Sequence, residues 1–214
     1  MLLIVILTLA TVVAASLHIR AEYRGPQHHV YTFKPLTTIS IILLALHVGT
    51  PDPTFYTYAI IAGLVCSFAG DIFLMLPSDQ FIPGLVSFLV AHLLYIAAFT
   101  SGTGFGFSWW ALAPWVIFGI IMFRMLSPHL GKMKFPVVLY MAVILVMAWQ
   151  AWERWGFTGQ PLALIASLGA VLFVVSDAIL ALNRFRAQFK TARLLNLTTY
   201  FAAQWLIALS ALSR

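Results

Sequence analysis

Eight apolar runs take up most of this chain of 214 residues, and no water-soluble fold of that length can hide so much apolar surface. An α-helix needs about 20 apolar residues to cross the hydrocarbon core of a bilayer, which is close to the length of each run. Charged residues make up 8% of the chain, against roughly 25% in a soluble domain. The expected spans are 1–19, 34–49, 54–76, 82–100, 108–125, 135–152, 161–182 and 192–212. We therefore expect an all-α fold, a polytopic membrane helix bundle of about eight transmembrane helices, with residues 1–214 as a single transmembrane domain.

The first run ends in small residues, as a cleaved signal peptide would, but no positively charged segment precedes it. We therefore expect it to be kept as the first span. All connections between the runs are short, which predicts that neighbouring helices pack antiparallel.

Basic residues are distributed unevenly between the two ends of this bundle. Of 12 Lys and Arg residues, two, Arg154 and Arg214, fall at the end where the chain starts. The ten at the opposite end are Arg20, Arg24, Lys34, Arg124, Lys132, Lys134, Arg184, Arg186, Lys190 and Arg193. Positive residues concentrate on the cytoplasmic side of membrane proteins, so we predict that this end is cytoplasmic and that both termini lie outside. The net charge of +6 then reflects orientation and anionic lipid heads, and no nucleic-acid partner is expected.

Six acidic residues occur in the chain, and two of them lie inside apolar runs. The four at span ends or in loops, where water can solvate them, are Glu22, Asp52, Asp79 and Glu153. Asp71 and Asp177 instead lie about 8 Å below the expected cytoplasmic interface, at 1.5 Å of helix rise per residue. A charge at mid-helix costs about 2.5–3.5 kcal/mol on insertion scales, which makes both residues functional candidates.

Small residues accompany both aspartates on their helix faces. Those near Asp71 are Gly63, Ser67 and Gly70, and those near Asp177 are Ala166, Gly169, Ala170 and Ala181. Such residues allow helices to pack closely in lipid. We expect the two carboxyl groups to come within about 8 Å of each other at a cavity reached from the cytoplasmic half. The alternative is that each aspartate merely bonds a neighbouring helix.

Further polar side chains fall at a similar depth and are candidates for binding or orienting a substrate. They are Lys34, Thr38, His92, Tyr95, Asn196, Tyr200 and Gln204. The last three recur every four residues and form one polar helix face. A lone histidine in an apolar helix is more often a packing residue than a ligand, so both interpretations of His92 stay open. Tyr140 and Gln150 are interpreted as structural.

A faint internal repeat links the two halves of the chain. Residues 70–76 resemble residues 176–182, and one helix later Tyr95 and Tyr200 each begin a similar short element. An offset of about four helices indicates a parallel repeat of two four-helix halves. Chance likeness between apolar helices is the alternative.

Several short motifs together resemble the YhhN/lysoplasmalogenase family. They are Phe33-Lys34-Pro35-Leu36, Gly70-Asp71-Ile72-Phe73-Leu74-Met75, Gly84 with Phe88, Ala91-His92 with Tyr95, Ser176-Asp177 with Leu180, and Tyr200 with Gln204. The resemblance covers about residues 33–208 and implies an eight-helix membrane hydrolase whose two intramembrane aspartates are Asp71 and Asp177. The implied reaction cleaves the vinyl-ether bond of a lysoplasmalogen, giving a fatty aldehyde and glycerophosphoethanolamine or glycerophosphocholine, with no cofactor or metal. The implied partners are the bilayer of a bacterial cell membrane and a single-chain lysophospholipid.

The residues suit that chemistry. Hydrolysis protonates the β-carbon of the vinyl ether and lets water attack the resulting oxocarbenium ion, which calls for one protonated carboxyl group and one carboxylate. Two close carboxyl groups divide a proton in this way. Lys34 is placed to hold a phosphate, while His92, Tyr200 and Gln204 could orient water.

Three other classes of protein also use buried carboxylates. In a metal-dependent lipid hydrolase, His92, Asp71 and Asp177 would hold zinc. An intramembrane aspartyl protease also has two aspartates on separate helices, but the usual Tyr-Asp and Gly-x-Gly-Asp motifs are replaced here by Gly-Asp and Ser-Asp. A proton-coupled transporter is the third. Sensitivity to a chelator or dependence on an ion gradient would distinguish these classes.

Overall fold

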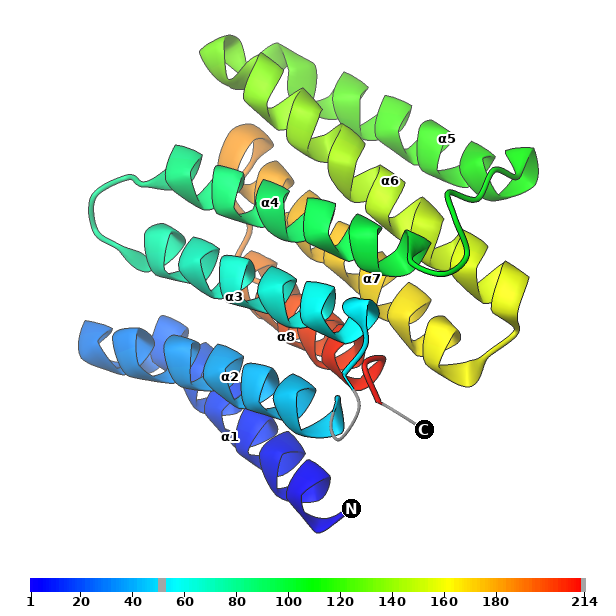
Figure 1. The fold of residues 1–214 in the computed structure, drawn as a ribbon. Helices are drawn as coiled ribbons and strands as arrows, with labels where there is room; N and C mark the ends of the chain where they lie inside the picture. The colour runs from blue at the N-terminus through cyan, green and yellow to red at the C-terminus, as the bar shows by residue number, and fades with distance from the viewer. Residues whose placement is uncertain (50–52, 213–214) are drawn as a thin grey trace.

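The computed structural model describes residues 1–49 and 53–212, in which eight α-helices form one bundle (Figure 1). The helices are α1 (Leu2–Arg24), α2 (Gln27–Val48), α3 (Phe55–Met75), α4 (Phe81–Thr100), α5 (Trp109–Leu126), α6 (Lys134–Thr158), α7 (Pro161–Ala181) and α8 (Ala192–Leu209). Two 3-10 turns, Ser127–His129 and Gly131–Met133, join α5 to α6, and a π-helical turn, Leu182–Arg186, extends α7. The predicted all-α architecture is confirmed. Asp52 and Arg214 lie outside the described residues.

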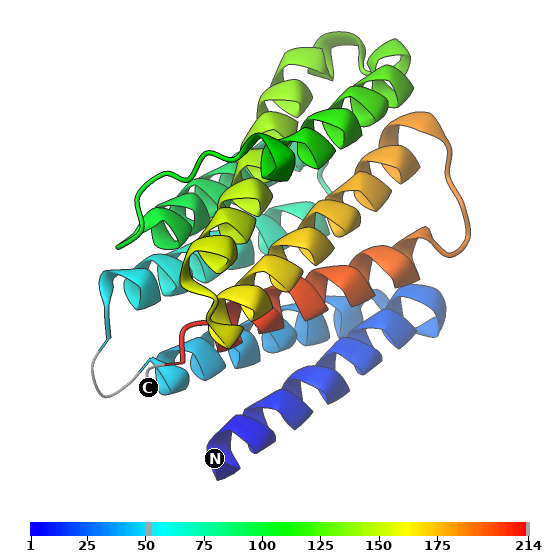
Figure 2. The same ribbon diagram turned by 90° about the vertical axis from the view of Figure 1, so that its right-hand side faces the viewer.

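Seven of these helices, α1 to α7, are long and apolar enough to cross a membrane. The remaining helix, α8, has 18 residues and carries the polar face that includes Tyr200 and Gln204. It packs along α7 and against α2, and Figure 2 shows it running beside α7 over most of that helix. The start of α1 and the end of α8 lie at the same end of the bundle in both views. The chain is therefore a multi-pass membrane protein, and its predicted orientation stays a prediction.

Several helices extend past the ends predicted from hydropathy, and α2 differs most. It begins at Gln27 rather than at residue 34, so Lys34 lies about two turns inside the helix instead of opening it. Pro35 accordingly lies within the helix. Hydropathy marks the part of a helix that contacts lipid, whereas backbone hydrogen bonding continues into the polar interface.

Contacts between the two halves of the chain build the centre of the bundle. Consecutive helices pack in pairs, α1 with α2, α3 with α4 and α7 with α8. In addition, α4 packs against α6 and α8 packs against α2. The last helix of each half therefore crosses to the other half, which brings side chains from distant parts of the sequence to one place.

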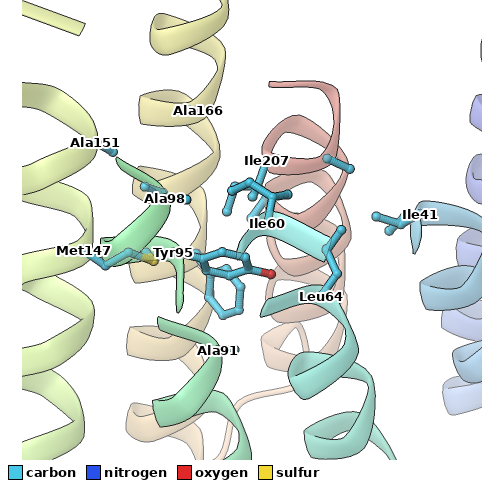
Figure 3. Close-up of a cluster of buried hydrophobic side chains, with 14 of the residues drawn as sticks. Ile41, Ile60, Leu64, Ala91, Tyr95, Ala98, Met147, Ala151, Ala166 and Ile207 are labelled. Carbon is cyan, nitrogen blue, oxygen red and sulfur yellow. The ribbon is translucent and has the colours of Figure 1, made fainter. Parts of the chain in front are cut away.

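The hydrophobic core packs around the fully buried ring of Tyr95. Figure 3 shows this ring beside Ile60 and Leu64 of α3, with Ile207 of α8 nearby. Gly63 faces the same ring, and a Cβ atom built on it would lie only 2.7 Å from Cδ1 of Tyr95. A glycine is therefore required where α3 meets α4.

We predict that Gly63→Ala lowers the stability of the protein, because the added methyl group forces Tyr95 out of its packed position. Overpacking of this kind costs about 1–3 kcal/mol. The measurement is thermal unfolding in detergent. Gly156→Ala is the matched control, because nothing lies within 4 Å of a Cβ at that position of α6. Equal melting temperatures for the two variants would contradict this account of the α3–α4 contact.

Candidate active site

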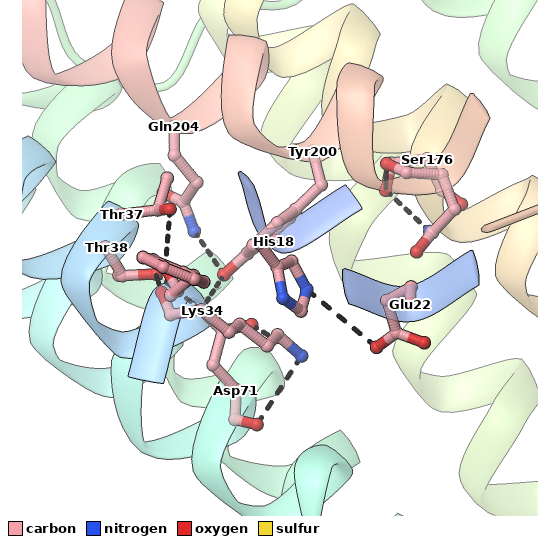
Figure 4. Close-up of polar contacts among 11 residues, drawn as sticks. His18, Glu22, Lys34, Thr37, Thr38, Asp71, Ser176, Tyr200 and Gln204 are labelled. Carbon is pink, nitrogen blue, oxygen red and sulfur yellow. Dashed lines mark hydrogen bonds and ion pairs between the residues drawn. The ribbon is translucent and has the colours of Figure 1, made fainter. Parts of the chain in front are cut away.

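Asp71 lies near the end of α3 and is 1% exposed, yet its carboxylate meets three donors (Figure 4). The ammonium group of Lys34 lies 3.2 Å from Oδ1. The hydroxyl groups of Thr38 and Tyr200 each donate a hydrogen bond of 2.8 Å to Oδ2. A buried charge is tolerated when it is paired and hydrogen-bonded, and helices α2 and α8 supply both kinds of partner.

A line of hydrogen bonds leads from Asp71 into the core. The amide nitrogen of Gln204 donates to the hydroxyl oxygen of Tyr200 at 3.2 Å, and the hydroxyl of Tyr95 donates to the amide oxygen of Gln204 at 2.9 Å. All three side chains are buried. The structure thus gathers five of the predicted substrate-orienting residues around the first aspartate.

Asp177 on α7 has a different environment. The hydroxyl of Tyr140 donates to its Oδ2, and Nε2 of His92 lies 2.9 Å from that hydroxyl and 3.8 Å from Oδ2. The Asp177 side chain is 16% exposed. Among the described residues, Oδ1 of Asp177 has no hydrogen-bond partner.

Tyr140 was interpreted as structural from the sequence, but it lies between His92 and the second aspartate. Its sequence context resembles that of packing tyrosines in any apolar helix. One signal could have found it: Tyr140 follows Pro136 by four residues, much as Thr38 follows Pro35 by three. Gln150 does have a structural role, because its amide bonds the backbone of Gly106 in both directions, at 2.9 and 3.0 Å.

The contacts of the two aspartates follow the same pattern. Each accepts a hydrogen bond from a hydroxyl group on the preceding helix, Thr38 on α2 or Tyr140 on α6. Each is also approached by the last helix of the other half, through Tyr200 on α8 or His92 on α4. This pattern is what a duplicated four-helix unit would produce, although the repeat itself stays a prediction.

Both aspartates line one polar cavity of about 230 Å³ between α1, α2, α3, α7 and α8. Its charged and polar lining residues are Glu22, Lys34, Asp71, Ser176, Asp177, Arg193, Asn196 and Tyr200. The predicted shared cavity is confirmed, while the predicted separation of the carboxyl groups stays a prediction. Asn196 bonds the backbone oxygen and the hydroxyl of Ser176, both at 2.9 Å, and so fixes part of the wall.

A second, apolar cavity of about 70 Å³ lies between α4, α5, α6 and α7. Side chains such as Phe118, Met122 and Ile144 line it, with Tyr140 and Asp177 at its polar edge. The two cavities share four lining residues: Leu74, Phe88, Asp177 and Leu180. A polar compartment and an apolar compartment therefore meet at the second aspartate.

The ligand set of the zinc alternative is not assembled in the described part of the chain. No three His, Cys, Asp or Glu side chains within residues 1–49 and 53–212 are grouped so that they could hold a metal ion. His92 is engaged with Tyr140, and Asp71 with Lys34.

Comparison with known proteins agrees with these features. A model of the YhhN family matches residues 30–211. The chain belongs to the YhhN family. It is 30% identical to the uncharacterized membrane protein YhhN of Escherichia coli O157:H7 over 94% of this chain and 96% of that protein. It is 37% identical to human lysoplasmalogenase TMEM86B over 73% of this chain and 65% of that protein, and 38% identical to bovine lysoplasmalogenase TMEM86A over 83% and 75%. No solved structure matches the chain significantly.

We predict that Tyr200→Phe destabilises this YhhN-family protein by about 1–3 kcal/mol, because the buried carboxylate of Asp71 loses one donor. Packing is retained, since the aromatic ring remains. Thermal or denaturant unfolding in detergent measures the change. Tyr58→Phe, on an exposed side chain of α3, should leave stability unchanged. A Tyr200→Phe protein as stable as this control would show that the hydroxyl does not support Asp71.

Proposed function

We propose that this YhhN-family protein is a membrane hydrolase that cleaves the vinyl-ether bond of a lysoplasmalogen, releasing a fatty aldehyde and glycerophosphoethanolamine or glycerophosphocholine. The observation that carries the proposal is the meeting of the polar and apolar cavities at Asp177. In a lysoplasmalogen the vinyl ether joins the polar head to the apolar chain. A molecule with its head in the polar cavity and its chain in the apolar cavity would place that bond beside Asp177. The names of the mammalian relatives point to the same reaction.

The surroundings of the two aspartates favour different roles. Asp71 is surrounded by donors, one of them the Lys34 ammonium group, which suits a carboxylate that stays negative. Asp177 has no Lys or Arg within ion-pair distance among the described residues, and its Oδ1 is unbonded. We therefore assign the general-acid role to Asp177 and the anionic role to Asp71.

The reaction then proceeds in three steps. Asp177 gives its proton to the β-carbon of the vinyl ether, and the carbon bonded to the ether oxygen becomes an oxocarbenium ion that the Asp71 carboxylate stabilises. A water molecule attacks that carbon and gives a proton to one of the carboxylates, forming a hemiacetal. The hemiacetal then collapses: its hydroxyl gives its proton to the carboxyl pair, its carbon–oxygen bond to glycerol breaks, and the glycerol oxygen takes a proton from the pair. The aldehyde leaves, and one carboxyl group of the pair is again protonated.

The remaining polar residues act around this pair. Tyr140 and His92 hold Asp177 in position through its Oδ2, which leaves Oδ1 for the substrate. Lys34 was expected to hold a phosphate; its ammonium group lies on Asp71 and also lines the cavity, so it could serve both groups. If the basic end of the bundle is cytoplasmic, the site opens in the cytoplasmic half of a bacterial cell membrane.

We predict that Asp71→Asn and Asp177→Asn each nearly abolish aldehyde release by purified protein, because the amide keeps the shape of the side chain and removes its acid–base function. The double variant should be scarcely worse than either single variant, since groups that act as a unit have non-additive effects. Aldehyde and glycerophospho-products are quantified by mass spectrometry.

Two controls keep this test interpretable. Unfolding and detergent size-exclusion profiles of the Asn variants should match the wild type closely enough to exclude misfolding. A chelator should leave wild-type activity in place; loss of activity restored by added zinc would move the assignment to a metalloenzyme. Strong activity in either Asn variant would remove that aspartate from catalysis.

We also predict that Ala178→Leu discriminates against long-chain substrates, because Ala178 lines the apolar cavity and a larger side chain shortens the space for the chain. The value of kcat/KM should fall for a long alkenyl chain and change little for a short one. Val175→Leu, on an exposed position of the same helix, is the matched control. Equal loss for both chain lengths would contradict the placement of the chain in this cavity.

A further inference from the structure

We propose that Glu22 binds the ammonium group of a zwitterionic head group in the polar cavity, and so sets the head-group preference of this protein. The inference rests on the proposed function and adds to it a residue that the sequence had assigned to simple solvation at a span end. Glu22 lines the same cavity as both aspartates, from the last turn of α1.

Four of the charged side chains that line the polar cavity form two ion pairs. Lys34 lies 3.2 Å from Asp71, and Arg193 lies 3.0 Å from Glu22. A phosphoethanolamine or phosphocholine head carries one negative and one positive group of its own. Such a head group can therefore replace the second ion pair, with its phosphate on Arg193 and its ammonium on Glu22, and leave none of these four charges unmatched.

An anionic head group offers no such exchange. Phosphoglycerol carries a phosphate that Arg193 can bind, but it has no cation for the Glu22 carboxylate. Glu22 would then lose its partner in a partly enclosed place, since its side chain is 21% exposed. Specificity arises in this way from a group left unpaired by the wrong ligand.

The buried imidazole of His18 is a second, independent observation at the same place. It is 0% exposed, and neither of its ring nitrogens has a hydrogen-bond partner among the described residues. Its Nε2 lies 3.9 Å from Oε1 of Glu22, a contact that Figure 4 marks with a dashed line. Buried polar atoms without partners are rare. His18 is therefore a positioning residue, which can hydrogen-bond Glu22 once that carboxylate leaves Arg193 for the ligand.

Helix α1, which supplies both residues, ends before residue 30, where the match to the family begins. Tyr23 ties the end of this helix to α8, since its hydroxyl donates to the backbone oxygen of Lys190 at 2.9 Å and accepts from the amide of Leu194 at 3.1 Å. The head-group contact is thus held in place by a helix outside the matched region.

The test compares two alkenyl lysophospholipids that differ only in the head group, phosphoethanolamine or phosphoglycerol. Glu22→Gln should reduce the wild-type preference for phosphoethanolamine by about fivefold in kcat/KM, the effect of roughly 1 kcal/mol for one partly exposed charge pair. The change should lie in KM. Arg193→Gln should weaken the binding of both substrates, because both carry a phosphate, but it should not abolish the preference for phosphoethanolamine, because Glu22 is still present. Asp79→Asn is the matched control, because Asp79 also pairs with an arginine, Arg184 at 2.9 Å, outside the polar cavity.

A binding measurement separates this inference from the proposed function. The corresponding alkyl ethers lack the vinyl bond, and their dissociation constants can be measured by tryptophan fluorescence without turnover. Selective weakening of alkyl phosphoethanolamine binding by Glu22→Gln supports the inference even if no aldehyde is ever released. An unchanged ratio of the two dissociation constants, or an equal change in the Asp79→Asn control, would overturn it. Absence of aldehyde from the wild type would instead overturn the proposed function.

Discussion

The ion pair between Lys34 and Asp71 decides how the centre of this bundle is arranged. A carboxylate among apolar helices is costly unless positive and hydrogen-bonding groups surround it. Lys34 and Thr38 of α2 and Tyr200 of α8 supply these groups. Both helices must therefore pack beside α3. Hydrogen bonds through Gln204 link Tyr200 to Tyr95. Gly63 lets α3 approach the ring of Tyr95. Removing one partner of such a pair leaves an uncompensated buried charge.

The second aspartate has partners of a different chemical kind. Asp177 meets a tyrosine and a histidine rather than an ammonium group, and it lies where a polar and an apolar cavity join. Two carboxyl groups that line one cavity thereby have unlike surroundings, which is the condition for dividing acid and base roles. An amphiphilic substrate suits the same geometry, because its polar and apolar parts separate where the reacting bond lies.

The helix that carries each residue could be predicted from the sequence, but the direction of its side chain around the helix axis could not. Hydropathy and charge located the eight helices and isolated Asp71 and Asp177, because a charge inside an apolar run stands out by itself. The partners of Asp177 were not predictable in the same way: Tyr140 resembles any packing tyrosine, and its role depends on α6 lying beside both α4 and α7. The roles of Glu22 and His18 were missed for a related reason. They depend on the packing of α8 against α1, which is a tertiary contact. Lys34 was placed at a helix start because hydropathy marks lipid rather than backbone hydrogen bonds.

In the proposed reaction, the carboxyl pair protonates a carbon atom of a vinyl ether. Hydrolysis of an alkenyl lysophospholipid by the purified protein in D₂O, with immediate reduction of the aldehyde to the alcohol, tests it most directly. We expect one deuterium atom from solvent on the carbon next to the former carbonyl carbon. An alcohol without deuterium at that carbon, or no aldehyde at all from properly folded protein, would contradict it.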